Sequence, residues 1–272
     1  MEEFTLKYFN QTKVFNHEVK LIDLLPDQDK KKYFCAKVNN RLHELNYTVF
    51  YDADIEFIDI SDEEGMYVYE ATLRYLLAMA LYELNKDIDL KISYYESRSL
   101  FGIILNENII VDDKFIVALN NKMREIVKND YPLNKKIVPN EEAKEIYQKF
   151  NMEDKIELLK YRPEKTVHFY ECNGYYNYMY GYMAPSIGYI NKWKILYHDE
   201  HGFLVFYPRY ETNGEIPQYN PSPRYSKTLD DSYEWAKMVS TDTVTKVNHH
   251  VEESGEVDFI NLCEAHHNNM LS

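Results

Sequence analysis

The sequence predicts an α+β protein built in two main parts, and three observations carry this prediction. The first 60 residues hold short runs with the two-residue alternation of β-strands. Near residue 66 the apolar spacing changes to the 3.6-residue period of helices, and later apolar runs between turn residues again predict antiparallel strands. We expect a β module at 1–62, a larger α+β domain with an antiparallel sheet at 63–247, and a helical tail at 248–272.

The order of elements in the first part defines its fold class. Two short runs separated by "NQT" predict a hairpin over residues 4–17. Residues 18–26 have helical spacing that stops at Pro26. Further strands are predicted at 33–39, 42–45 and 54–60. A strand pair, then a helix, then further strands is the order of a β-grasp module.

The second part alternates helices with strand pairs. A densely apolar helix is predicted over 66–84, buried on most sides. The other predicted elements are strands at 90–95 and 100–105, helices at 112–129 and 140–150, a hairpin at 192–208, a loop at 213–227, and terminal helices at 229–239 and 257–267.

Composition and charge narrow the classes of function. With 31 basic and 45 acidic residues the formal charge is −14, which does not favour nucleic acid as a partner because phosphate contacts need clustered Lys and Arg. The absence of an apolar run of about 18 residues and of a signal peptide argues against a membrane partner. Three cysteines far apart in sequence predict reduced thiols and a cytoplasmic location.

The most unusual stretch is "HFYECNGYYNYMYGYMAPSIGY" at 168–189, with seven tyrosines in 22 residues. If it is extended, one strand face carries Tyr176, Tyr178, Tyr180 and Tyr182. Such a face suits a wall that stacks a base, and Ser186 and Arg162 are candidates to complete a small-molecule site. An aromatic core, or an interface with another domain, is the alternative.

Three segments resemble known modules. Residues 36–59, "AKVNNRLHELNYTVFYDADIEFID", resemble the second half of the TGS domain, the β-grasp module of threonyl-tRNA synthetases. Residues 75–148, which begin "YLLAMALYEL", resemble the adjacent editing-type domain of those enzymes. Residues 161–190 resemble the amino-terminal half of bacterial nucleoside kinases of the uridine kinase type, which carry both modules ahead of a P-loop kinase domain.

The resemblance also implies a degenerate metal site. The synthetase domain uses a His-x-x-x-His pair and a downstream Cys-x-x-x-His. Here Ala71 and Tyr75 occupy the first pair of positions, and Cys172 and Tyr176 the second pair. Only the cysteine survives, so we expect neither a bound metal nor a catalytic residue.

No G-x-x-x-x-G-K-[ST] loop is present, so we expect no cofactor in this chain. ATP and Mg²⁺ are expected only for a kinase domain beyond Ser272. The resulting expectation is a non-catalytic accessory region of a nucleoside kinase, which binds a small ligand or docks on a carboxy-terminal kinase domain. The alternative is a free-standing tRNA-editing-like hydrolase related to threonyl-tRNA synthetase, and a ligand sensor without a kinase partner is a third hypothesis.

Overall fold

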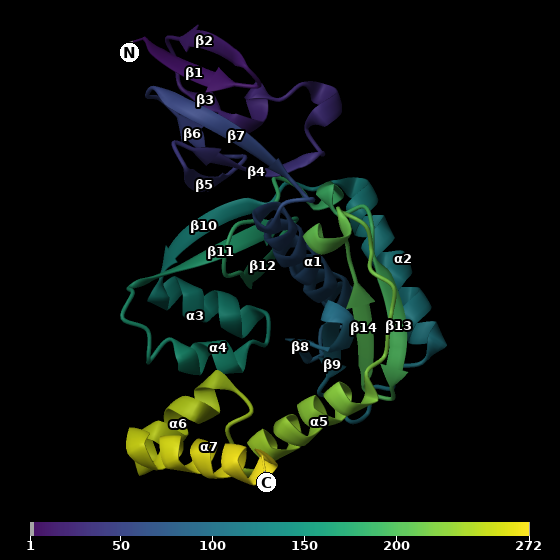
Figure 1. The fold of residues 1–272 in the computed structure, drawn as a ribbon. Coiled ribbons are helices and arrows are strands. Elements are labelled where there is room, and N and C mark those ends of the chain that lie inside the picture. The colour runs from purple at the N-terminus through teal and green to yellow at the C-terminus, as the bar shows by residue number, and fades with distance from the viewer. Residues whose placement is uncertain (1–2, 272) are drawn as a thin grey trace. The chain divides into compact units, whose positions relative to one another are not determined.

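The computed structural model describes residues 3–271 and confirms the α+β class with antiparallel sheets (Figure 1). The chain forms two compact units. The first comprises Met1–Ile137 and His168–Asn220, and the second comprises Val138–Val167 and Pro221–Ser272. These units divide the chain differently from the predicted domains 1–62, 63–247 and 248–272. The predicted boundaries stay a prediction.

A five-stranded sheet forms the start of the first unit. Its order is β2-β1-β7-β4-β5, and the two central strands β1 and β7 run parallel while the outer pairs are antiparallel. This is the strand order of a β-grasp sheet; its assignment to the TGS branch stays a prediction. The strands are β1 Phe4–Tyr8, β2 Gln11–Phe15, β4 Tyr33–Val38, β5 Arg41–Glu44 and β7 Ala53–Asp59, with a separate pair β3 Val19–Lys20 and β6 Thr48–Val49.

The helix predicted at 18–26 is reduced to a single 3₁₀ turn, η1, over Leu21–Leu24. The backbone N–H groups of Leu21 and Ile22 donate to the carbonyl oxygens of Tyr47 and Leu45 at 3.0 and 2.9 Å. Because the segment around Leu45 and Tyr47 accepts both of these N–H groups, and Pro26 stops any extension, a longer helix does not form here.

Helix α1, Glu63–Leu84, follows the sheet and forms the centre of the first unit. Asp62 caps it by accepting the N–H of Glu64 at 3.2 Å. A Cβ on Gly65 would lie 1.9 Å from the carbonyl oxygen of Asp59, so glycine is needed where the helix turns back against the end of β7. The helix is buried along most of its length, as its apolar sequence predicts.

Two further sheets and one long helix follow α1 along the chain. A four-stranded antiparallel sheet has the order β13-β14-β9-β8, and α2 packs against α1. A hairpin of β11 and β12 belongs to a three-stranded sheet with β10. The bounds are β8 Leu90–Tyr94, β9 Leu100–Ile104, α2 Asp113–Asn129, β10 Asn134–Pro139, β11 Thr166–Cys172, β12 Tyr175–Tyr178, β13 Lys194–Asp199 and β14 Gly202–Phe206.

The second unit is mainly helical. Its helices are α3 Asn140–Lys149, α4 Glu153–Leu158, α5 Pro223–Met238, α6 Val244–Ser254 and α7 Glu256–Leu271. Helix α6 begins before the predicted tail at 248. Within this unit Tyr161 donates to Glu252 at 2.8 Å, and Trp235 stacks on His266 with ring centroids 4.1 Å apart.

Asp130 joins three segments of the first unit. It ends α2 in the left-handed conformation, with φ of 50°. Its carboxylate accepts hydrogen bonds from Lys31 Nζ at 2.5 Å, Ser186 Oγ at 2.5 Å and the N–H of Gly188 at 2.9 Å. Partial burial opposes the charge, but the bonds from Lys31 and Ser186 outweigh it and hold the pKa of Asp130 below its usual value.

We predict that Asp130→Asn lowers the free energy of unfolding by about 1–2 kcal/mol at pH 7, because asparagine tolerates the left-handed backbone but loses the charge that Lys31 contacts. The pKa of Asp130 is lower in the folded state, so its contribution is present above the unfolded pKa near ~3.9 and is lost as the pH falls through the folded pKa. Urea unfolding of both proteins at pH 7 and pH 3 measures this difference.

The matched control is Asp113→Asn, an exposed aspartate in the first turn of the same helix, which should change stability by less than about 0.5 kcal/mol. Equal stability of the Asp130 variant and the wild type at pH 7 would contradict the joining role of Asp130.

Candidate functional site

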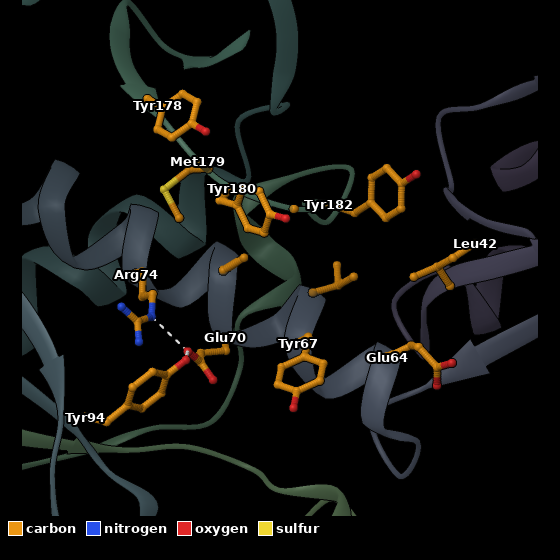
Figure 2. Close-up of a pocket in the computed structure, with 13 residues that line it drawn as sticks. Leu42, Glu64, Tyr67, Glu70, Arg74, Tyr94, Tyr178, Met179, Tyr180 and Tyr182 are labelled. Atoms are coloured by element: carbon orange, nitrogen blue, oxygen red, sulfur yellow. Dashed lines mark hydrogen bonds and ion pairs between the residues drawn. The ribbon is translucent and has the colours of Figure 1, made fainter. Parts of the chain in front are cut away.

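A cavity of about 530 Å³ lies in the first unit between helix α1, strand β5, strand β8 and the segment after β12 (Figure 2). This volume is within the range of small-ligand pockets. Helix α1 supplies most of its floor. The lining residues are Leu42, Glu64, Tyr67, Val68, Glu70, Ala71, Arg74, Tyr94, Tyr178, Met179, Tyr180, Gly181 and Tyr182.

Three of the four predicted wall tyrosines line this cavity, although they do not share a strand face. Strand β12 ends at Tyr178, and Gly181 has a φ of 98°, so the chain leaves the extended conformation before Tyr182. Tyr180 is 89% exposed beside the cavity, and Figure 2 shows its ring beside Met179. The strand face expected over 175–182 is therefore not formed, and a role of these tyrosines in binding stays a prediction.

The other predicted site residues lie elsewhere. Tyr176 accepts a hydrogen bond from Lys136 Nζ at 2.7 Å and does not line the cavity. Ser186 donates to Asp130 at 2.5 Å. Arg162 belongs to the second unit, where its Nη2 donates to the carbonyl oxygen of Thr166 at 3.5 Å. Their predicted roles in binding stay predictions.

Glu70 forms a buried hub at one end of the cavity. Only 4% of the residue is exposed, and both carboxylate oxygens accept hydrogen bonds. Oε1 accepts from Arg74 Nε at 2.9 Å and from Tyr94 Oη at 2.6 Å, while Oε2 accepts from Tyr207 Oη at 2.6 Å. Arg209 Nη1 lies 3.9 Å from Oε2. With this many donors the carboxylate anchors the site and has little capacity left to act as a base.

The hub positions Arg74 at the cavity. Its guanidinium carbon lies 4.6 Å from the centroid of the Tyr94 ring, which lies against the cation. Figure 2 shows both side chains beside Glu70. Burial and the bond to Glu70 raise the pKa of Tyr94, so its hydroxyl stays a donor at neutral pH. Among residues 3–271 Arg74 Nη2 is buried without a hydrogen-bond acceptor.

The four positions of the degenerate metal site are not equivalent in the structure. Ala71 lines the cavity and leaves space there. Tyr75 is fully buried, with its hydroxyl 2.8 Å from the carbonyl oxygen of Tyr175 and 3.2 Å from that of Tyr170. Burial raises its pKa. Tyr75 thus occupies the interior with a backbone hydrogen bond instead of facing a metal or a substrate.

Cys172 is fully buried in β11, and burial raises the pKa of its thiol to about 12, with a smaller contribution from Glu171. A neutral, enclosed thiol is a poor nucleophile and a poor metal ligand. Over residues 3–271 no cluster of three or more His, Cys, Asp or Glu side chains could hold a metal ion. In the same range no helix is long and apolar enough to cross a membrane.

Sequence reasoning missed Glu70 and Arg74. The available signal was an acid and an arginine at i and i+4 in a helix that is otherwise apolar on most sides. In such a helix charged residues are buried only when they are paired, so this pair marked the place where α1 meets a polar site.

The chain is similar to threonine–tRNA ligases. It is 29% identical to threonine–tRNA ligase 1 of Bacillus subtilis over 169 residues, which is 61% of this chain and 26% of the relative. It is 29% identical to the ligase of Caldanaerobacter subterraneus over 173 residues (63% of this chain and 27% of the relative). It is 23% identical to that of a Wolbachia strain over 198 residues (72% of this chain and 31% of the relative).

The chain therefore spans about a quarter to a third of the length of these relatives, and no family model matches it. These similarities agree with the resemblance of the sequence to threonyl-tRNA synthetase modules. They give no support to a uridine kinase parent.

We predict that one of the three thiols reacts rapidly with Ellman's reagent in the native protein at pH 8, because Cys35 and Cys172 are both buried and burial raises the pKa of each to about 12. Cys263 is half-buried and supplies the reactive thiol. Absorbance of the released thiolate, with and without guanidinium chloride, measures one fast equivalent in the native state and three after unfolding.

The control variant Cys263→Ser should remove the fast phase. Rapid native labelling of Cys172, mapped by mass spectrometry, would contradict its enclosed position.

Proposed function

We propose that this chain is an editing-type module related to threonyl-tRNA synthetase, which takes the aminoacylated 3′-terminal adenosine of a tRNA into the tyrosine-lined cavity. The observation that carries the proposal is the similarity to threonine–tRNA ligases over 61% of the chain. The cavity supports it, because Ala71 in its floor stands at a position where the resemblance places a site histidine of the editing-type domain.

The side chains that line the cavity can recognise the 3′-terminal adenosine of a tRNA. Tyr67, Tyr178 and Tyr180 offer rings that can stack on an adenine, and their hydroxyls can bond a ribose. The negative balance of the chain limits this recognition to the terminal nucleotide, because Lys and Arg are too few to track a long phosphate backbone. A tRNA end as ligand departs from the expectation that nucleic acid is an unlikely partner, an expectation that stays a prediction.

Hydrolysis of the aminoacyl ester, the reaction of a tRNA-editing-like hydrolase, is the second candidate function. The similarity to threonine–tRNA ligases favours it. The residues at the lost site argue against the route of the related enzymes, since Tyr75 and Cys172 are buried and neutral. A hydrolytic reaction here would need a water molecule activated by other groups of the cavity.

The nucleoside-kinase hypothesis stays a prediction. It would make this chain an accessory region with a carboxy-terminal kinase domain as its partner and with ATP and Mg²⁺ as cofactors of that domain. The relatives reported above are all ligases, so they favour the synthetase-related function. A cytoplasmic location is likewise still a prediction.

We predict that a non-hydrolysable 3′-aminoacylamido-adenosine raises the melting temperature of the protein, because a ligand that binds only the folded state stabilises it. Tyr180→Ala should reduce the shift at a given ligand concentration at least severalfold, since this exposed ring is available for stacking without supporting the core. Thermal unfolding over a range of ligand concentrations gives the apparent affinity of each variant.

Tyr197→Ala is the matched control, because Tyr197 is a 50% exposed tyrosine on β13 outside the cavity. The absence of any shift at millimolar ligand would refute the proposal. A panel of tRNAs charged with cognate and non-cognate amino acids separates binding from catalysis. Accelerated deacylation would establish the hydrolase, and its loss in Cys172→Ser would contradict the enclosed thiol.

A further inference from the structure

We infer that the cavity contains a phosphate site, with Arg74 as the group that binds the phosphate of a nucleotide whose base lies among the tyrosines. This inference deepens the proposed function and rests on it for the identity of the nucleotide. It assigns a role to a residue that the resemblance to the synthetase module does not cover, because Arg74 lies between the two lost histidine positions 71 and 75.

The first observation is the state of the arginine itself. Arg74 uses Nε to bond Glu70, its Nη2 is buried without an acceptor among residues 3–271, and 22% of its side chain is exposed. An unmade hydrogen bond of a charged group costs free energy, so the described residues leave this guanidinium incompletely satisfied. A guanidinium fork matches the oxygens of phosphate and carboxylate groups.

The second observation is the local charge. Behind the cavity Arg74 and Arg209 lie on Glu70, while Arg209 and Arg98 contact Glu211. Within this group three arginines contact two glutamates, while Glu63 accepts a hydrogen bond from the lining residue Tyr67 at 3.0 Å. The other carboxylate of the lining, Glu64, is paired with Lys37 at 3.0 Å. Arg74 is the only cationic residue among those that line the cavity.

The third observation concerns the pre-organisation of the arginine. Arg74 is held on one side by the Glu70 carboxylate, and the Tyr94 ring covers the face of its guanidinium. Glu70 is itself fixed by Tyr94 and Tyr207. Because these contacts restrict the side chain before a ligand arrives, less conformational entropy is lost on binding.

The size and the walls of the cavity select a nucleotide over a smaller anion. A free amino acid or inorganic phosphate fills only part of about 530 Å³ and offers no planar ring to Tyr67, Tyr178 or Tyr180. A nucleotide supplies both the anion and the ring. The phosphate can come from a free mononucleotide or from the phosphodiester next to the last adenosine of an RNA, and both sources present the same chemistry to Arg74.

The test measures binding to the full chain by isothermal titration calorimetry with four probes: AMP, adenosine, the trinucleotide CCA with a free 3′ hydroxyl, and inorganic phosphate. We expect AMP or CCA to bind at least tenfold more tightly than adenosine and than phosphate alone. Tighter binding of AMP would identify a free nucleotide as the source of the phosphate, and tighter binding of CCA would identify an RNA end. We also expect affinity to fall as salt is raised.

Arg74→Met keeps most of the side-chain volume and removes the charge, and it should weaken AMP or CCA binding about tenfold to a hundredfold and adenosine binding by much less. Arg124→Met is the matched control, because Arg124 also lies over an aromatic ring, at 5.5 Å from Trp193, but belongs to α2 and does not line the cavity. It should bind as the wild type does.

Removal of Arg74 leaves Glu70 with one donor fewer, so circular dichroism must confirm that the variant is folded. If it is not, Arg74→Lys, which keeps the charge but loses the planar fork, takes its place with an expected weakening of at least threefold. Three results would overturn the inference. The protein could bind AMP and adenosine with equal affinity, or the folded Arg74 variants could bind AMP or CCA as tightly as the wild type. The third is that no probe binds at millimolar concentration.

The two proposals can fail separately. In one case the protein binds the aminoacylamido-adenosine, loses this binding in Tyr180→Ala, and gains no affinity from a phosphate. That result would support the proposed function and rule out the phosphate site. Binding of AMP that depends on Arg74, with no effect of the aminoacyl group, would leave the phosphate site and remove the proposed function.

Discussion

The structure of the first unit depends on the burial of helix α1. A helix that is enclosed along most of its length needs hydrogen-bond partners for the polar side chains that it carries into the interior, because an unpaired buried polar group costs free energy. Four residues of α1 show how this requirement is met. Tyr69 donates to a carbonyl oxygen at 2.5 Å, Thr72 donates to Val68 and accepts from Ala184, Glu70 is bonded by three side chains, and Tyr75 lies between two carbonyl oxygens.

These hydrogen bonds fix the elements around the helix as well. The bond from Ala184 to Thr72 and the contacts of Asp130 with Ser186 and Gly188 hold the segment after β12 against α1 and α2. The end of β12 and this segment carry Tyr178, Tyr180 and Tyr182 along the cavity. The position of the tyrosine wall therefore follows from polar contacts of buried residues that lie outside the cavity.

The elements that could be predicted from sequence are those with a strong local signal. The long helix and the strands of the first 60 residues follow from periodicity and turn residues, whereas the order of those strands in the sheet comes from the structure. The tyrosine wall could be predicted only in part, since alternation indicates which residues share a side but not where Gly181 ends the extended backbone. The hub on Glu70 could not be predicted, because Tyr94 reaches it from the end of β8 and Tyr207 from the segment just after β14, 137 residues away.

The contrast between Tyr75 and Arg74 connects the fold to its chemistry. At position 75 a tyrosine fills the interior and bonds the backbone, so the place of a site histidine becomes part of the core. One residue earlier, the buried carboxylate of Glu70 holds the guanidinium of Arg74 at the cavity, and the positive charge of Arg74 stabilises that carboxylate. Burying Glu70 without Arg74 and Arg209 would leave a charge in a low-dielectric interior, so the pairing that stabilises the helix also keeps a guanidinium beside the space that Ala71 leaves open.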